Sequence, residues 1–301
     1  MEISQTSHRN GVQLADLGMV TDAKWFDYKQ DGRPDLVIVV EWMAVEVFEN
    51  DGNGLERVTE TSIGATLQGW WNTVSIVDLD NDGDEDVIAG NHGLNWRFRS
   101  TESSPLSLYI HDFDGNGSVE HIFCHFVNGE EKPLTLRHEL VAQIPELKKK
   151  YLKYEAYVDQ RMADIFPQES LSKALRLSVN HLASTVLWNN GDGTFSAKEL
   201  PVQAQFTPIY AIESTDVNGD KIPDLIIAGN LYDAKPQAGR YDASYGLVLL
   251  GDGTGFLSMK SQESGLFIDG EVRDFKTLST SQGDMLLVAR NNDALMTFSL
   301  P

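Results

Sequence analysis

The feature that most constrains this chain is a nine-residue, aspartate-rich phrase of the form Asp-x-(Asp/Asn)-x-(Asp/Asn)-Gly-x-x-Asp. It recurs with small variations in four segments, 27–35, 78–86, 112–120 and 216–224. After each copy comes a dense apolar run, for example Leu36 to Val40. Runs of this kind are typical of strands that are buried on both faces. The sequence therefore predicts a repeated unit in which an acidic loop joins two strands.

The four copies differ in how completely they follow the phrase. Segments 78–86 and 112–120 carry an oxygen-bearing side chain at every expected position. Segment 216–224 has Lys221 where glycine is expected, and segment 27–35 has Lys29 at its third position. The segment that contains Lys29 is therefore the weakest candidate for binding a cation.

Alternating oxygen donors in a tight loop are the arrangement that Ca²⁺ requires, because this ion takes about six to eight oxygen ligands. We expect carboxylate or amide ligands from the first, third, fifth and ninth positions, a backbone carbonyl from the seventh, and a sharp turn at the sixth. The predicted metal-binding residues are Asp78, Asp80, Asp82, Asp84, Asp86, Asp112, Asp114, Asn116, Ser118, Glu120, Asp216, Asn218, Asp220, Asp224, Asp27, Asp31 and Asp35. Two to four structural calcium ions are expected.

The loops have two alternative interpretations. An EF-hand needs a glutamate at the twelfth position, where this chain has Ile38, Ala89, Phe123 and Ile227. Ordinary Asp/Gly turns would need no metal. The acidic ninth residue in all four copies favours metal, since buried carboxylates without a cation are costly.

A second phrase, rich in Asn-Gly and Asp-Gly pairs, recurs at 48–54, 188–195 and 250–256 and predicts hairpin turns. These hairpins alternate with loop starts at 27, 78, 216 and a degenerate start at Asp274. Such alternation predicts an all-β fold, a β-propeller with four to five visible blades. The step from 78 to 112 is short, which leaves open whether the loop at 112 belongs to an abbreviated blade.

One stretch interrupts the strand pattern. Between Pro133 and about His181, apolar residues recur at helical spacing, and Pro145 suits a helix first turn. The residues at this spacing are Leu140, Ile144, Leu147, Tyr151, Tyr154 and Val158. We therefore predict one propeller domain over residues 1–301, with an α-helical insertion at 133–183.

Charge and cysteine content exclude several classes. The formal net charge is −21, which would repel nucleic acid and anionic lipid. Cys124 is the single cysteine, so no internal disulfide forms. No apolar stretch is long enough to span a membrane, and residues 1–11 lack the layout of a signal peptide. We expect the sequence to begin partway through a longer propeller protein.

At the acidic loops the chain resembles the FG-GAP/VCBS repeat family, which includes integrin α-type propellers and cartilage acidic protein 1 type repeats. Segments 69–72, 90–95 and 239–242 look like parts of bacterial surface proteins that combine such repeats with an ASPIC/UnbV-type region, which is absent here. The resemblance implies calcium loops on one face and an extracellular or cell-surface location in the bacterial envelope. Integrin-type propellers have seven blades, so the visible blades are either part of a larger propeller or close unusually.

The expected function is binding or adhesion, with a glycan or a protein as ligand. Aromatic and arginine side chains outside the loops suit such recognition, and the candidate ligand surface is Trp96, Arg97, Arg240 and Tyr241. For Trp70 and Trp71, packing between blades is the alternative role. The competing function is a calcium-dependent polysaccharide lyase or glycosidase. No catalytic motif or separate acidic pair supports it, so an enzyme is not expected.

Overall fold

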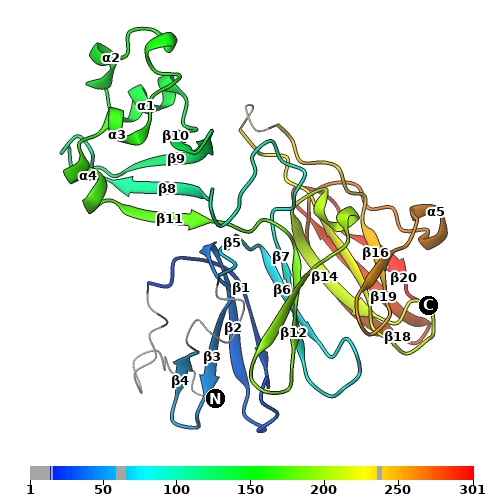
Figure 1. Cartoon of the computed structure of the whole chain (residues 1–301). Coiled ribbons are helices and arrows are strands. Elements are labelled where there is room, and N and C mark those ends of the chain that lie inside the picture. The colour runs from blue at the N-terminus through cyan, green and yellow to red at the C-terminus, as the bar shows by residue number, and fades with distance from the viewer. Residues whose placement is uncertain (1–13, 15, 59–65, 236–238) are drawn as a thin grey trace, which may run out of the picture. The chain divides into compact units, whose positions relative to one another are not determined.

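The computed structural model describes residues 14, 16–58, 66–235 and 239–301. The chain divides into two compact units (Figure 1). Unit 1 consists of Met1–Arg97 and Leu182–Pro301, and unit 2 consists of Phe98–His181. Within the described ranges, no helix combines the length and the apolar character needed to cross a bilayer.

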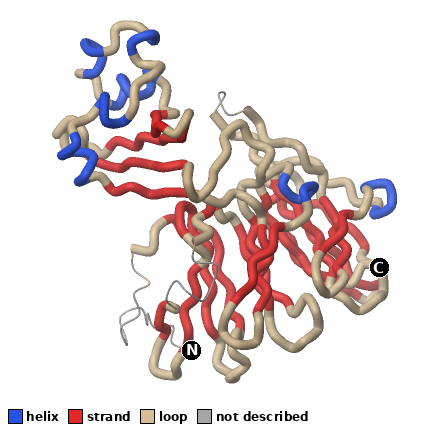
Figure 2. Tube along the Cα trace, in the orientation of Figure 1, coloured by secondary structure: helices blue, strands red, loops and turns tan. Residues whose placement is uncertain are grey.

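Unit 1 contains four antiparallel sheets, which we call blades 1 to 4 (Figure 2). Blade 1 holds β1 (Met19–Phe26), β2 (Asp35–Met43), β3 (Glu46–Asn50) and β4 (Leu55–Arg57), with β5 (Gly69–Trp70) beside β2. Blade 2 holds β6 (Thr73–Val77), β7 (Asp86–Gly90), β12 (Thr185–Asn189) and β13 (Phe195–Glu199). Blade 3 holds β14 (Ile209–Thr215), β15 (Asp224–Gly229), β16 (Leu247–Gly251) and β17 (Phe256–Ser258). Blade 4 holds β18 (Val272–Thr280), β19 (Gly283–Arg290) and β20 (Met296–Ser299).

The blades of unit 1 pack in sequence through their first strands, β1 beside β6, β6 beside β14 and β14 beside β18. A separate apolar core fills each interface between successive blades. Neighbouring residues of β7 show how one strand serves two cores: Val87 and Ala89 face blade 1, whereas Ile88 faces blade 3. This arrangement confirms the all-β, propeller-type fold and explains why the apolar runs are dense rather than alternating.

Each first strand of blades 1 to 3 runs into an acidic loop, and the second strand returns from it. Loops 27–35, 78–86 and 216–224 therefore lie where first strands end, at what we call the loop edge of unit 1. The starts of the first strands and the ends of the second strands form the opposite edge. Two short helices, η2 (Val202–Gln205) and α5 (Ser261–Ser264), occupy connections in this unit.

Unit 2 has its own sheet and its own core. The strand order is β10-β9-β8-β11, formed by β8 (Leu106–His111), β9 (Glu120–Val127), β10 (Glu130–Pro133) and β11 (Leu175–Val179). The helices are α1 (Arg137–Gln143), α2 (Leu147–Lys150), η1 (Tyr154–Ala156), α3 (Met162–Ile165) and α4 (Gln168–Lys173). Leu140, Ile144 and Tyr151 of the helical stretch pack against Ile122 and Cys124 of β9.

The loop at 112–120 joins β8 to β9 and therefore belongs to unit 2, not to a blade of unit 1. Unit 2 is inserted between β7 and β12, the second and third strands of blade 2. The short sequence spacing between the loops at 78 and 112 therefore arises because the second loop belongs to the inserted sheet and not to the next blade.

The helical stretch is shorter than the predicted insertion at 133–183. Helices occur between Arg137 and Lys173, and the residues that follow form β11, which pairs with β8. Pro145 lies between α1 and α2 and prevents them from forming one continuous helix, so the predicted helical periodicity breaks down after α1. Tyr154 and Val158, predicted on the apolar face, are consequently exposed.

Asp274 was predicted to start a degenerate loop, and this prediction is wrong. Asp274 lies inside β18, where it pairs with Ala289 of β19. The connection that corresponds to an acidic loop is the tight turn between Thr280 and Gly283, which has no acidic residue. The predicted strand at 285–289 does lie in β19.

Candidate functional site

The ninth residue of each acidic loop has a buried carboxylate that binds the backbone of the loop. Asp35, Asp86, Glu120 and Asp224 are all buried. In every loop one of its carboxylate oxygens accepts a hydrogen bond from the backbone N–H of the second loop residue. The donors and distances are Tyr28 at 3.3 Å, Leu79 at 3.0 Å, Phe113 at 2.7 Å and Val217 at 2.8 Å. The carboxylate therefore satisfies a backbone donor that would otherwise be buried without a partner.

In blades 1 to 3 the second oxygen of the same carboxylate reaches the hairpin of the blade. Asp35 accepts from the Asn50 N–H at 2.7 Å, Asp86 from Asn189 at 2.8 Å and Asp224 from Gly251 at 2.8 Å. These donors belong to the second phrase of the sequence, whose predicted hairpins are β3–β4, β12–β13 and β16–β17. One buried carboxylate thus joins the acidic loop to the hairpin in each of these blades.

The first residue of each loop sets its curvature. Asp78 accepts a hydrogen bond from the backbone N–H of Gly83 at 3.0 Å, and Asp112 accepts one from Gly117 at 2.9 Å. Gly83 has φ of 101°, in the region that favours glycine. Lys221 takes the same position in its loop with φ of 71°. The loop conformation is therefore kept even where glycine is missing.

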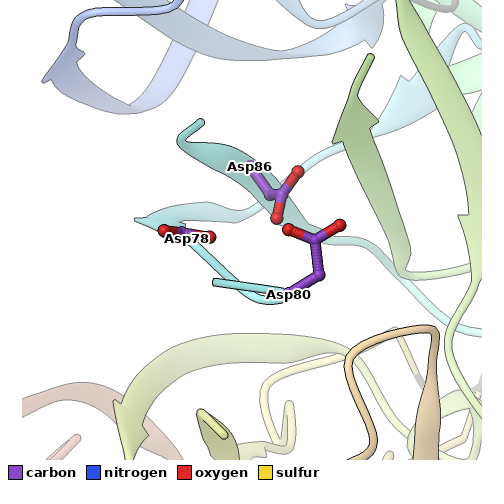
Figure 3. A group of neighbouring side chains, drawn as sticks. All are labelled: Asp78, Asp80 and Asp86. Carbon is purple, nitrogen blue, oxygen red and sulfur yellow. The ribbon is translucent and has the colours of Figure 1, made fainter. Parts of the chain in front are cut away.

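Two of the four loops bring three carboxylates together. One oxygen each from Asp78, Asp80 and Asp86 lies within 4.8 Å of the others (Figure 3). Asp112, Asp114 and Glu120 of unit 2 form an equivalent group, also within 4.8 Å. We call these groups the Asp86 cluster and the Glu120 cluster.

The Asp86 cluster has the electrostatics of a cation site. Burial and the neighbouring carboxylates of Asp80 and Asp82 raise the pKa of Asp86 to about 6. Burial, followed by the charges of Asp82 and Asp78, also raises the pKa of Asp80. The Oδ1 atom of Asp78 is shielded from solvent and has no hydrogen-bond partner among the described residues. A divalent cation would relieve the repulsion and satisfy this oxygen.

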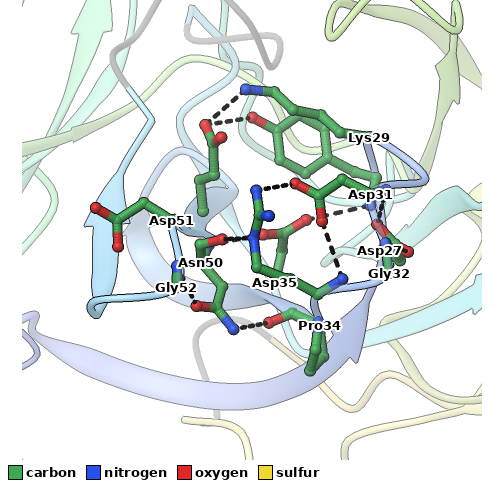
Figure 4. A network of polar contacts seen from close by, with 12 residues as sticks. Asp27, Lys29, Asp31, Gly32, Pro34, Asp35, Asn50, Asp51 and Gly52 are labelled. Carbon is green, nitrogen blue, oxygen red and sulfur yellow. Dashed lines mark hydrogen bonds and ion pairs between the residues drawn. The ribbon is translucent and has the colours of Figure 1, made fainter.

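Loop 27–35 holds the basic residues Lys29 and Arg33 at the positions where loop 78–86 holds Asp80 and Asp84. Figure 4 shows the polar contacts of loop 27–35. The Nζ atom of Lys29 lies 2.7 Å from Oε2 of Glu49. Arg33 pairs with Asp31 and donates to the carbonyl of Asn50 at 2.8 Å. In the described chain no group of three acidic or histidine ligands was found in this loop or in loop 216–224.

The remaining predicted ligands take part in local turns. Asp82 accepts from the Asp84 N–H at 2.8 Å, and Asn116 accepts from the Ser118 N–H at 2.7 Å. In loop 216–224, Asp216 accepts from the Lys221 N–H, Asn218 from the Asp220 N–H and Asp220 from the Ile222 N–H, at 2.9, 2.9 and 2.8 Å. Asp27 accepts from the N–H groups of Asp31 and Gly32 at 3.0 and 2.8 Å.

The three loops of unit 1 touch one another along the loop edge. Gln30 donates to the Gly83 carbonyl at 2.8 Å, and Asn81 donates to the Lys221 carbonyl at 3.2 Å. The backbone N–H of Asp27 also donates to Glu85 at 2.9 Å. The Asp86 cluster therefore sits in the middle loop of a connected row.

The opposite edge of unit 1 carries an aromatic cluster formed by Trp42, Trp70, His92, Trp96 and Tyr241. The ring centroid of Trp70 lies 5.1 Å from those of Trp42, His92 and Trp96. His92 lies 5.0 Å from Trp96 and 4.8 Å from Tyr241. Trp71, by contrast, is fully buried in the core between blades 1 and 2.

The cluster brings together two of the four predicted ligand-surface residues, Trp96 and Tyr241. Burial raises the pKa of Tyr241 to about 12, and the charge of the nearby Arg97 opposes this shift. Arg240 stacks on Tyr232, with 3.4 Å from its guanidinium carbon to the ring centroid. All four predicted residues therefore lie at or beside aromatic rings.

Glu41, Tyr210 and Arg273 also belong to this edge and were not predicted from the sequence. Tyr210 and Arg273 each occupy a register shift at the start of a first strand, in β14 and β18. Such bulges re-aim a side chain. The Arg273 guanidinium lies 4.5 Å from the Tyr210 ring centroid, and the charge of Glu41 acts on the same phenol. No local motif marks these residues, because their proximity depends on strand register.

Comparison with known proteins gives one family. Residues 27–89 match the model of the FG-GAP-like repeat. No curated protein matches the sequence. Among solved structures, BBS1N in complex with ARL6DN is similar over 94% of this chain and 93% of that chain, at 12% identity and a TM-score of 0.24, which is too low to relate the folds. The matched residues span loop 27–35 to strand β7, and this part of the chain is therefore an FG-GAP-like repeat.

Proposed function

We propose that this chain is a calcium-stabilised β-propeller binding module of a secreted or cell-surface bacterial protein, with a glycan or protein as its ligand. The observation that carries the calcium role is the pair of carboxylate clusters in loops 78–86 and 112–120. The residues that would hold the ions are Asp78, Asp80 and Asp86 in unit 1, and Asp112, Asp114 and Glu120 in unit 2.

The position of Asp86 makes the proposed metal structural. Its carboxylate already binds the backbone of its own loop at Leu79 and of the hairpin at Asn189. A cation beside this carboxylate would stabilise its charged form and so strengthen both contacts. Calcium bound there would hold loop and hairpin of blade 2 together, and the contacts of Gln30 and Asn81 would extend its effect to the adjacent loops.

We expect isothermal titration to find two calcium sites, one removed by Asp80→Ala and the other by Asp114→Ala. Each variant deletes one member of a carboxylate cluster in a different unit. At free calcium about 100-fold above Kd, each site should raise the free energy of unfolding by about 2.7 kcal/mol. Asp233→Ala, an exposed acid outside the loops, is the matched control and should retain both sites. A wild-type chain with neither binding heat nor a calcium-dependent rise in stability would refute the calcium role.

Lys29→Asp is expected to add a third calcium site. The substitution gives loop 27–35 the acidic third position of loop 78–86 and removes the cation that now pairs with Glu49. Titration should then show three sites in place of two, and Lys29→Ala, which removes the cation without adding a carboxylate, should still show two. Equal stoichiometry in both variants would mean that Arg33 alone suffices to exclude the ion.

The second candidate function is a polysaccharide-active enzyme, favoured by the proximity of Glu41, Tyr210 and Arg273. A carboxylate, a phenol and an arginine are groups that acid–base cleavage of a glycan can use. Incubation with the polysaccharides named below, followed by assays for reducing ends and unsaturated products, tests it. For a binding module we expect no release of either.

A further inference from the structure

The aromatic cluster is built as a surface and not as a finished core. Of its five residues, Trp42 and Tyr241 are buried, whereas Trp70, His92 and Trp96 are half-buried. Burial lowers the pKa of His92 to about 4, so this ring is neutral at physiological pH. Its Nε2 atom is shielded from solvent without a hydrogen-bond partner in the described chain. Native cores rarely leave such an atom unsatisfied, which points to a missing partner.

Glu41 places a carboxylate beside these rings. It is opposite Trp70 in the β2–β5 pairing, so the two side chains share one side of the sheet. Glu41 is half-buried, and burial raises its pKa. In the described parts of the chain the carboxylate makes no hydrogen bond or ion pair, although an unsatisfied, partly desolvated acid is costly. Its oxygens are free to accept hydrogen bonds from a ligand.

Trp42 supplies an independent sign of a functional site. Its φ of 68° lies in the left-handed region, where bulky residues are rare. The residue occupies a register shift between Glu41 and Met43 and places its ring edge-on to Trp70. Backbone strain of this kind costs roughly 1 to 3 kcal/mol and clusters at binding sites.

The charges at this edge decide between ligand classes. Each of three arginines lies beside an aromatic ring of this edge, Arg97 near Tyr241, Arg240 over Tyr232 and Arg273 over Tyr210. Two of them are paired, Arg240 with Asp242 at 3.7 Å and Arg273 with Glu271 at 2.9 Å. Together with Glu41 the edge is close to neutral, although the chain carries −21. An edge that is close to neutral repels neither an uncharged nor an acidic polyol, unlike the rest of this acidic chain.

We propose that the aromatic cluster and Glu41 form a carbohydrate-binding site. A sugar ring packs its C–H face on the half-buried Trp70 and Trp96, and its hydroxyl groups donate to the free carboxylate of Glu41. Arg97 and Arg240 border this position. The inference rests on the proposed binding function and names the ligand class and the residues that recognise it.

Affinity electrophoresis in native gels that contain a soluble polysaccharide tests this site. The probes are xylan, laminarin and galactomannan as neutral chains, and polygalacturonate and alginate as acidic chains. We expect at least one of them to retard the wild-type chain. Glu41→Gln, which keeps the shape of the side chain, and Trp70→Ala should each weaken binding by about ten-fold or more. Unfolding midpoints of both variants confirm that they are folded.

The controls are Glu56→Gln, an exposed acid of blade 1, and Trp25→Ala, a tryptophan that is 61% exposed outside the cluster. Both should bind as the wild type does. The proposal is overturned if no probe retards the chain, or if binding survives both Glu41→Gln and Trp70→Ala. If a probe retards the chain but the titration finds no calcium site, only the calcium role is refuted. If the chain binds a protein but no polysaccharide, the binding function stands and this site is refuted.

Discussion

Replacing Asp224 with alanine is expected to lower the free energy of unfolding of unit 1 by about 3 to 5 kcal/mol. Asp224 is fully buried, and its two oxygens accept hydrogen bonds from the backbone N–H groups of Val217 and Gly251, both at 2.8 Å. Alanine leaves both donors without a partner in the core. Because the two donors lie in the acidic loop and the hairpin of blade 3, the substitution also disconnects these segments.

Urea unfolding in excess chelator measures this effect without any contribution from bound metal. Tryptophan fluorescence is a suitable signal, since all 6 tryptophans lie in unit 1. Asp224→Asn, which retains one acceptor oxygen, should lose less stability than Asp224→Ala, and the exposed Asp233→Ala should lose almost none. If Asp224→Ala costs under about 1 kcal/mol, the buried carboxylate does not hold the loop.

Gly229→Ala should be still more damaging, with a loss above about 4 kcal/mol or a failure to fold. A Cβ atom at this position would lie 1.7 Å from the carbonyl oxygen of Pro208 and 2.8 Å from its carbonyl carbon. Both are backbone atoms of the residue just before β14, and they cannot move without disturbing the pairing of β14 with β15. The clash therefore falls on the first two strands of blade 3, of which β14 packs against β6 of blade 2.

Gly255→Ala is the matched control for Gly229→Ala. It is the same chemical change, but the nearest atom is the Nζ of Lys198 at 2.8 Å, the end of a flexible side chain that can turn away. The control should fold and lose no more than about 1 kcal/mol. A Gly229→Ala chain as stable as Gly255→Ala would show that β14 and β15 are less closely packed than the structure places them.

The blades could be predicted because their strands and turns are marked by short sequence patterns. The acidic phrase with its buried ninth residue, the dense runs such as Leu36 to Val40 and the Asn-Gly hairpins all depend on neighbours in sequence, and they predicted the strands and turns of unit 1. The sequence predicted an insertion at 133–183 but not its true start, because the hairpin of β8 and β9 carries the same acidic phrase as a blade. Only strand pairing, with Val186 of β12 opposite Ile88 of β7, separates the two.

The candidate sites show the same limit. The clusters at Asp86 and Glu120 could be read from the phrase, because their ligands lie within nine residues of each other. Only part of the aromatic edge could be predicted from the sequence, which named Trp96 and Tyr241 as candidates for a ligand surface. Glu41, Trp42 and His92 join them through register shifts and the approach of separate blades, which no local pattern encodes.

The insertion of unit 2 also delays the completion of blade 2 during synthesis. Strand β7 ends at Gly90 and its partner β12 starts at Thr185. At about 5 to 20 residues per second, the ribosome needs roughly 5 to 20 s to supply that partner. Unit 2, which has its own core, can fold during this interval. During this interval the edge of β7 that later pairs with β12 stays unpaired, so blade 2 cannot be completed before unit 2 has been synthesised.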